Sequence, residues 1–250
     1  MPGPEEFRRD IREAKRFGVI QVLALLLSGL SLVLTIALAV TGSWLEAAVT
    51  AGFCAAFAAM LAYLIRRQER LRRETTQYYT FPLPHAFDYE TVCSTMAAVP
   101  GIQWTHICDE AARICRIKAA FSWRVALLHQ PIFSNSDYKA QRDRANQAAS
   151  RAHPSKKEGP RWEIESMARI YLVVCDDIND ALSRYISTHT QQLLTRNECI
   201  VNMAVVGDRL LIPPVRGADV DLPSLNRCFH SVDLIWSQLS RNSTEPRIRP

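Results

Sequence analysis

The chain has 250 residues, of which 48% are hydrophobic, and a net charge of +5. This length accommodates one or two domains. The positive excess does not indicate nucleic-acid binding, because much of it comes from arginines that flank two long apolar segments. The mean hydropathy of −0.06 is therefore an average over an apolar N-terminal quarter and a more polar remainder.

Two apolar segments, residues 17–40 and 45–65, make up most of that N-terminal quarter. Their only strongly polar side chains, Gln21 and Glu46, lie near the segment edges. About 20 apolar residues in a helix are enough to cross the hydrocarbon core of a bilayer. The polar break between the segments is too short to return the chain across a membrane. The sequence therefore predicts a membrane α-helical hairpin of two transmembrane helices over residues 17–66.

Basic residues flank both ends of this hairpin, whereas its connecting turn contains no lysine or arginine. Because cytoplasmic flanks of membrane helices are enriched in these residues, we expect a multi-pass protein of the cell membrane with both termini in the cytoplasm. A cleaved signal peptide is the alternative, but its apolar core would be only about 7–15 residues long. The flanking residues are Arg8, Arg9, Arg12, Lys15 and Arg16 before the hairpin and Arg66, Arg67, Arg70, Arg72 and Arg73 after it.

Two bordering segments, residues 1–16 and 67–84, are expected at the membrane surface. In the first, Phe7, Ile11 and Ala14 recur at helical spacing, which predicts an amphipathic lead-in at the headgroup level. The second is predicted to be a basic stem that ends in an extended linker. Its arginines are expected to contact anionic lipid headgroups, since each contributes about 1 kcal/mol near an acidic leaflet. The lipid bilayer is thus the first partner that the sequence predicts.

Small residues gather on one half of the second apolar segment. Such residues let helix backbones approach closely in a bilayer. Two interpretations remain open: the face packs only on the first segment, or it also packs on another protomer or a partner subunit. The residues expected at this helix-packing face are Ala48, Gly52, Ala55, Ala56 and Ala59.

Residues 85–240 are predicted to form an α+β cytoplasmic domain with a mostly antiparallel sheet and helices on one side. Asp88 is expected to cap its first helix, and three strands follow over residues 102–129. Residues 134–161 are expected to be a polar, basic, partly helical insertion. This insertion is either a solvated surface or a basic contact for nucleotides or lipids. Residues 241–250 are expected to be a disordered tail.

The second half of the domain shows a clearer pattern of periodic apolar residues. Its expected elements, in order, are a buried strand over residues 168–175, a helix over residues 178–195, a β-hairpin over residues 199–215 that turns at Gly207-Asp208, and a final helix over residues 222–240.

Few residues suggest chemistry, and no common catalytic or nucleotide-binding motif is present in the sequence. Asp176 and Asp177 follow a predicted strand, where carboxylates can be catalytic, yet they can equally cap the next helix. A second candidate set has zinc-type ligands, although two residues at i and i+2 on a helix point apart. Its members are His106, Cys108, Cys228 and His230. No cofactor is predicted, and the cysteines are expected to be reduced.

Two functions therefore remain open from the sequence. The first is an integral membrane protein that presents a cytoplasmic interaction or sensory module within a larger membrane assembly, with a protein partner or a second copy in contact. The second is a membrane-anchored hydrolase or nucleotide-acting enzyme that uses Asp176, Asp177 and the basic insertion. A pocket that gathers these aspartates with another titratable group would favour the enzyme.

Overall fold

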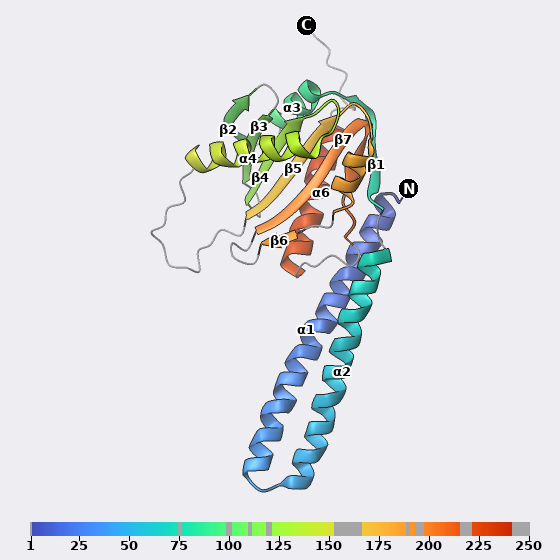
Figure 1. Cartoon of the computed structure of the whole chain (residues 1–250), viewed down its shortest axis with the longest axis vertical. Coiled ribbons are helices and arrows are strands. Elements are labelled where there is room, and N and C mark those ends of the chain that lie inside the picture. The colour runs from blue at the N-terminus through green and yellow to red at the C-terminus, as the bar shows by residue number, and fades with distance from the viewer. Residues whose placement is uncertain are drawn as a thin grey trace.

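A computed structural model describes residues 2–74, 77–98, 102–109, 112–118, 122–152, 167–188, 191–193, 198–215 and 222–241. Two long N-terminal helices form a stalk, and a mixed α+β domain sits at one end of it (Figure 1). The elements are α1 (Pro4–Val40), α2 (Trp44–Glu74), β1 (Tyr79–Phe87), α3 (Tyr89–Ala97), β2 (Ile102–Asp109), β3 (Ala112–Lys118), β4 (Ser122–His129), α4 (Asn135–Ala152), β5 (Met167–Cys175), α5 (Asp180–Ile186), β6 (Gln191–Leu193), β7 (Glu198–Ile212) and α6 (Leu222–Arg241).

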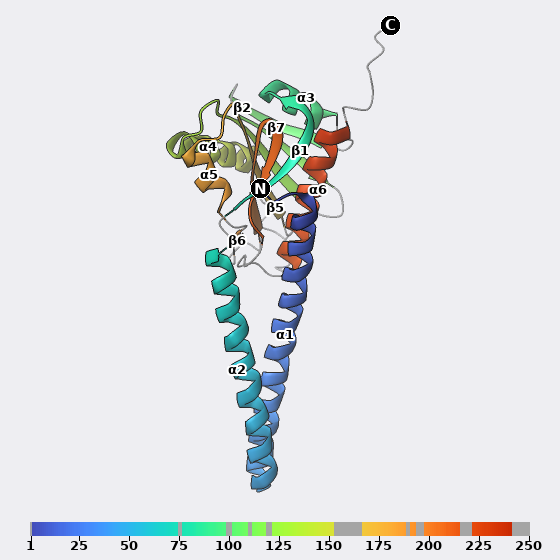
Figure 2. The same cartoon turned by 90° about the vertical axis from the view of Figure 1, so that its right-hand side faces the viewer.

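The helices α1 and α2 are antiparallel neighbours, and both are long and apolar enough to cross a membrane. Gly42 makes the turn between them at a φ of +83°, a conformation that glycine adopts without steric cost. The start of α1 lies against the α+β domain, and the end of α2 lies just below it, as two perpendicular views show (Figures 1 and 2). The expected hairpin of two candidate membrane helices is therefore present.

Within the hairpin, the least exposed residues alternate at spacings of three and four, which is the heptad pattern of a coiled-coil seam. Polar side chains also make contacts across this seam. Gln21 donates to Gln68 at 2.8 Å, Thr35 donates to Thr50 at 3.0 Å, and the hydroxyl of Ser28 lies 4.0 Å from the thiol of Cys54. The seam consists of Gln21, Ala24, Ser28, Ser31, Thr35 and Leu38 on α1 and of Ala47, Thr50, Cys54, Phe57, Leu61, Leu64 and Gln68 on α2.

The N-terminal part of α1 packs into the domain, which corrects the expectation of a lead-in at the headgroup level. Phe7 and Ile11 are each 2% exposed and belong to the larger hydrophobic core. The ring of Phe7 meets the rings of Tyr79 and Phe81 edge-on, with centroids 5.2 and 5.5 Å apart. The apolar periodicity of residues 7–14 was a correct indication of an amphipathic helix, but its apolar face is covered by β1 and α6.

The sheet order is β1-β7-β5-β4-β3-β2, with β6 paired to β7. The pairs β4–β5 and β5–β7 are parallel, and the others are antiparallel, so the sheet is mixed and the expectation of a mostly antiparallel sheet was wrong. Parallel neighbours need a long crossover, usually a helix. The segment expected to be a polar insertion supplies it, because α4 connects β4 to β5.

Two further expectations about the sheet were wrong. Residues 79–84, expected to be a linker, belong to β1, which pairs with β7 at the sheet edge. The expected hairpin over residues 199–215 is instead one long strand, β7, which pairs with β5 before Gly207 and with β1 after it. Gly207 has a φ of +58°. Before it, the odd-numbered residues of β7 face the larger core, and after it, the even-numbered residues do, as expected for a β-bulge.

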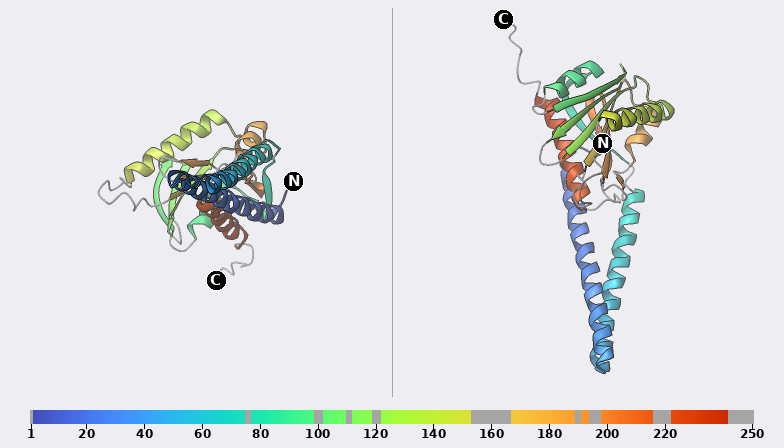
Figure 3. Two further views of the ribbon diagram at one scale, coloured as in Figure 1. Left: turned by 90° about the horizontal axis from the view of Figure 1, so that it is seen from below. Right: turned by 90° about the vertical axis from the view of Figure 1, so that its left-hand side faces the viewer.

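Helices cover both faces of the sheet rather than one (Figure 3). On one face, the start of α1 packs with α3 and α6 over the larger core. On the other face, α4 and α5 cover a second core that contains Leu128, Phe133, Tyr138 and Leu182. Alternate residues of β4 and β5 enter the two cores, because successive side chains of a strand point to opposite faces.

Candidate functional site

Asp176 and Asp177 lie exposed in the loop after β5 and cap no helix. The N-cap of α5 is Asn179, whose side chain accepts a hydrogen bond of 2.8 Å from the amide of Leu182 and donates one of 2.9 Å to the carbonyl of Phe133. The capping prediction for the two aspartates was therefore wrong, and α5 ends at Ile186 rather than near residue 195. Among the described residues, no third His, Cys, Asp or Glu gathers with the two aspartates.

The four candidate zinc ligands come from two separate elements, β2 and α6. Cys228 is buried in the larger core, whereas His230 is exposed on another face of the same helix. His106 and Cys108 belong to β2, and their side chains lie outside the described residues. In the part of the chain that the structure describes, no group of three possible ligands comes together.

The five small residues expected at a helix contact are all exposed and lie outside the seam between α1 and α2. A Cβ added at Gly52 would meet no atom within 4 Å. These five residues therefore lie away from α1 in the single chain, whereas Ala47, on the same half of α2, is buried in the seam. A contact of the exposed face with another chain stays a prediction. Of the stem arginines, Arg66, Arg67 and Arg70 are exposed, and the guanidinium of Arg67 lies 5.8 Å from the ring centre of Phe17. The side chains of Arg72 and Arg73 lie outside the described residues.

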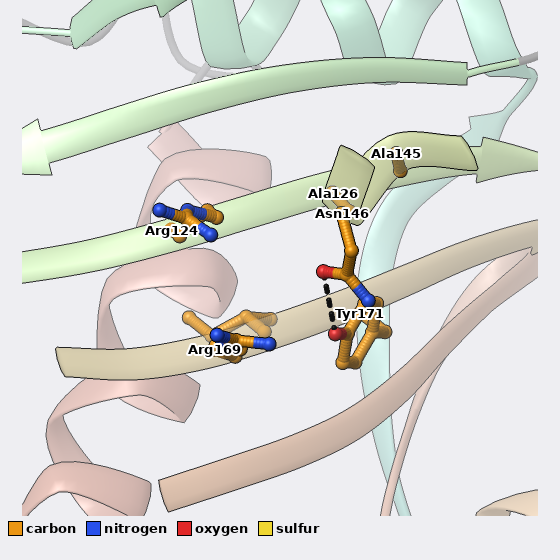
Figure 4. A pocket seen from close by; sticks show the side chains of 7 residues that line it. Arg124, Ala126, Ala145, Asn146, Arg169 and Tyr171 are labelled. Carbon is orange, nitrogen blue, oxygen red and sulfur yellow. Dashed lines mark hydrogen bonds between the residues drawn. The ribbon is translucent and has the colours of Figure 1, made fainter. Parts of the chain in front are cut away.

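A shallow surface depression lies between α4 and the adjoining face of the sheet. Two arginines, Arg124 on β4 and Arg169 on β5, lie next to each other at its base (Figure 4). They are partners in the parallel register of these strands, and both are partly buried. Neighbouring strands are about 4.8 Å apart, so the register places two guanidinium side chains on adjacent strands at the same height.

The remaining polar groups of this depression come from α4 and β5. The hydroxyl of Tyr171 donates a hydrogen bond of 3.1 Å to Asn146 Oδ1. Apolar contacts come from Ala126 and Ala145. The described lining residues thus present two guanidinium groups, one phenol and one carboxamide, and no carboxylate is among them.

Buried aromatic side chains hold the floor and side of this depression in place. The ring centres of Tyr138 and Tyr171 are 6.3 Å apart, and those of Tyr138 and Tyr185 are 4.6 Å apart. Burial raises the pKa of both Tyr138 and Tyr185 above the ordinary phenol value. These phenols therefore stay protonated near neutral pH, and the only full charges on the described lining of the depression are those of Arg124 and Arg169.

Sequence reasoning missed this pair of arginines for a topological reason. Each is the third residue of a strand, and nothing in the local sequence distinguishes it from a solvated position. The two residues meet only because β4 and β5 are parallel neighbours, whereas an antiparallel arrangement was expected. The informative signal was the buried apolar run of β5, which is typical of parallel strands covered on both faces.

The chain matches no family model, no curated protein and no solved structure. What the chain does therefore has to be inferred from its own residues and contacts.

Proposed function

We propose that this chain is an integral membrane protein that presents an α+β interaction or sensory module on the cytoplasmic side of the cell membrane. The observation that carries the proposal is the continuity of α1. One unbroken helix contains both the first candidate membrane span and two residues, Phe7 and Ile11, that are buried in the core of the domain. A change of state in the domain is therefore transmitted to the bilayer through a packed helix rather than through a loose linker.

Several contacts support such transmission. The ring of Phe229 on α6 stacks on Phe7 at 6.4 Å, and Lys15 of α1 lies 5.4 Å from the same Phe229 ring centre. Residues Phe7 and Lys15 are two turns apart along α1, so α6 supports the helix over that length. Helix shifts of 1–2 Å are a common way for packed elements to carry conformational changes. We therefore assign α6 and α1 together to the coupling of the domain with the hairpin.

The distribution of charge supports a cytoplasmic domain. The basic clusters at the start of α1 and at the end of α2 lie where the hairpin meets the domain, and residues 41–43 between the helices contain no lysine or arginine. The side with the positive flanks is the cytoplasmic side. Both termini and the domain then share the cytoplasm, with the exposed Arg66, Arg67 and Arg70 near anionic headgroups.

The orientation can be tested with the sequon Asn242-Ser243-Thr244, which follows α6. Glycans are attached in the lumen of the secretory pathway. When the full chain is expressed in a eukaryotic secretory system, we expect Asn242 to remain unmodified, and a lumenal reporter protein serves as the positive control. A glycan on Asn242 would place the domain on the opposite side and overturn the orientation.

The partner in this proposal is a transmembrane helix of another chain, either a second copy or a different subunit, that packs on the small-residue face of α2. This face carries Ala48, Gly52, Ala55, Ala56 and Ala59, all exposed in the single chain. The test is the mass of the detergent complex extracted from native membranes, measured by light scattering. Gly52→Leu should reduce this mass to that of one chain, whereas Phe53→Leu, at a position 58% exposed, should leave it unchanged. A wild-type chain that is extracted as a monomer would contradict the assembly.

A further inference from the structure

We propose that Lys15 of α1 exchanges between the ring of Phe229 on α6 and the phosphate of an anionic lipid headgroup. The charge of the membrane surface then acts on the contact between α1 and α6. The ammonium of Lys15 lies 5.4 Å from the ring centre of Phe229, and both side chains are only half-buried. This inference rests on the proposed function, because it takes residues 17–40 as a membrane span and assigns a stimulus to the sensory module.

The lipid-exposed surface of the hairpin fixes the depth of Lys15. On α1 the first exposed large apolar side chain is Val19, at 46%, and on α2 the last is Ile65, at 53%. The guanidinium of Arg67 lies 5.8 Å from the ring centre of Phe17, so the two limits are at a similar level. Lys15 precedes Val19 by four residues, which places its backbone about 6 Å closer to the domain. A headgroup layer is about 5–7 Å thick, so the backbone of Lys15 lies within it.

The ammonium of Lys15 is nevertheless directed away from the bilayer. Long side chains of a helix point back toward its N-terminus, which for α1 lies at the domain (Figure 2). The ring that Lys15 contacts also stacks on Phe7, which is two turns nearer to that terminus. A change of rotamer, which takes picoseconds to nanoseconds in an exposed side chain, brings the ammonium to the level of the lipid phosphates. One backbone position therefore serves two alternative contacts.

The two contacts are similar in strength. A cation over a partly exposed aromatic ring gains about as much free energy as a lysine next to an anionic leaflet. When two states are nearly balanced, a ligand that favours one of them shifts the populations. In a neutral membrane Lys15 stays on Phe229 and ties α1 to α6, whereas in an anionic membrane it moves to a headgroup and releases this tie.

A second contact of the same kind provides an internal comparison. The guanidinium of Arg8 lies 6.0 Å from the ring centre of Trp236, also between α1 and α6. Arg8 precedes Val19 by eleven residues, and its backbone is therefore about 16 Å closer to the domain, beyond the headgroup layer. A response to lipid charge should be confined to Lys15 and Phe229, whereas a general loosening of α6 would affect both contacts.

The experiment uses the full chain in nanodiscs, with 4-fluorophenylalanine in place of Phe229, and records the fluorine NMR resonance of this ring. Phosphatidylglycerol replaces a rising fraction of phosphatidylcholine at constant ionic strength. We expect the resonance to move with the anionic fraction and to reach a plateau, because the cation leaves the ring. Fluorotryptophan in place of Trp236 is measured in the same lipid mixtures, and its resonance should stay fixed.

Two variants make Lys15 itself the variable. Lys15→Gln should hold the Phe229 resonance near the anionic plateau in every lipid mixture, because the ring then has no cation to lose. Arg12→Gln removes an exposed charge one turn nearer to the domain, where Arg12 Nε donates to the carbonyl of Arg8 at 3.4 Å, and should keep the response. Glycerol 3-phosphate added to neutral discs should leave the resonance unchanged, since soluble phosphate is not held at the leaflet.

Three outcomes overturn this inference. The first is a wild-type resonance at position 229 that does not move with the anionic fraction. The second is a Lys15→Gln variant that responds like the wild type. The third is an equal response at position 236, or an equal response to glycerol 3-phosphate. Failure of the proposed orientation is recognised separately, because it appears as a glycan on Asn242, whereas both faces of a nanodisc carry the same lipids.

Discussion

The hydroxyl of Tyr79 on β1 donates a hydrogen bond of 2.8 Å to Asp10 Oδ2 on α1, although 69 residues separate the two in sequence. Both side chains are buried, at 1% and 6% exposure. Burial of a carboxylate is unfavourable unless it is paired or hydrogen-bonded, and Arg9 Nε lies 3.5 Å from the other carboxylate oxygen. The amide of Thr80 also donates to the carbonyl of Pro2 at 2.8 Å. The start of α1 is thus attached to β1 by polar as well as apolar contacts.

The first prediction concerns this attachment. In a double-mutant cycle of Asp10→Ala and Tyr79→Phe, the two positions should couple by about 1.5–3 kcal/mol, because the hydrogen bond involves a charged acceptor. The measurement is the free energy of unfolding of the full chain in detergent. The exposed ion pair of Arg8 and Glu5, at 3.1 Å, is the control and should couple by about 0.2–1 kcal/mol. Additive effects at positions 10 and 79 would mean that the hydrogen bond is absent from the folded chain.

The second prediction concerns the seam of the hairpin. Ala24 is fully buried between α1 and α2, so Ala24→Leu should separate the helices and lower the free energy of unfolding by about 1–3 kcal/mol. Gly52→Leu adds the same kind of bulk on the outward face, where a new Cβ has no neighbour within 4 Å, and should leave the stability of the single chain nearly unchanged. Thermal unfolding in detergent compares the two. Equal destabilisation by both variants would contradict the observed orientation of α2.

The third prediction distinguishes the true helix cap from the two aspartates before it. Asn179→Ala removes the hydrogen bond to the amide of Leu182 and should destabilise the domain by about 0.5–2 kcal/mol. Asp177→Ala changes an exposed loop position and should stay within about 0.5 kcal/mol of the wild type. Chemical denaturation of the full chain measures both. The reverse order of effects would restore the capping role that the sequence suggested for the aspartates.

The fourth prediction concerns acid stability at α3. Asp88 caps this helix and accepts a hydrogen bond of 2.7 Å from the amide of Thr91. Hydrogen bonds from the side chain and the amide of Thr91 lower the pKa of Asp88 below its ordinary value of 3.8. A lowered folded-state pKa contributes stability that is present above the ordinary value and is lost as the pH falls through the lowered one.

Asp88→Asn provides the test, because asparagine caps a helix about as well but does not titrate. Above the ordinary pKa the wild type should be more stable by about 0.3–1 kcal/mol, the size of an exposed charge at a helix N-terminus. This advantage should shrink as the pH is lowered further below 3.8. Unfolding temperatures across that range report it. An advantage that does not change with pH would show that the Asp88 charge plays no part.

The parts of the fold that the sequence predicted correctly depend on local periodicity. The apolar lengths of α1 and α2, the Asp88 cap and the positions of β2, β4, β5 and α6 all follow from patterns within one segment. The failures involve relations between distant segments. Gly207-Asp208 has the composition of a hairpin turn, yet β1 was already available to pair with the second half of β7, so a bulge replaced the turn.

The same limit applies to the faces of the helices and to the candidate site. A helical wheel of α2 separates small from large residues, but it does not tell which side meets α1. The seam uses Thr50, Cys54 and Gln68, whose partners lie on the other helix. The pairing of Arg124 with Arg169 likewise depends on a parallel register that is absent from either strand alone.

The central claim is that the start of α1 is buried in the domain rather than in the lipid headgroups. It is tested most directly by a small diazirine-bearing aliphatic residue at position 11, in the full chain in bilayers. Ile11 is 2% exposed within the core that contains Tyr79 and Val232. We therefore expect photolysis to link position 11 to a peptide from β1 or α6 of the same chain. The same residue at position 19, where Val19 is 46% exposed in the candidate span, should give lipid adducts. Lipid adducts at position 11 would contradict the account.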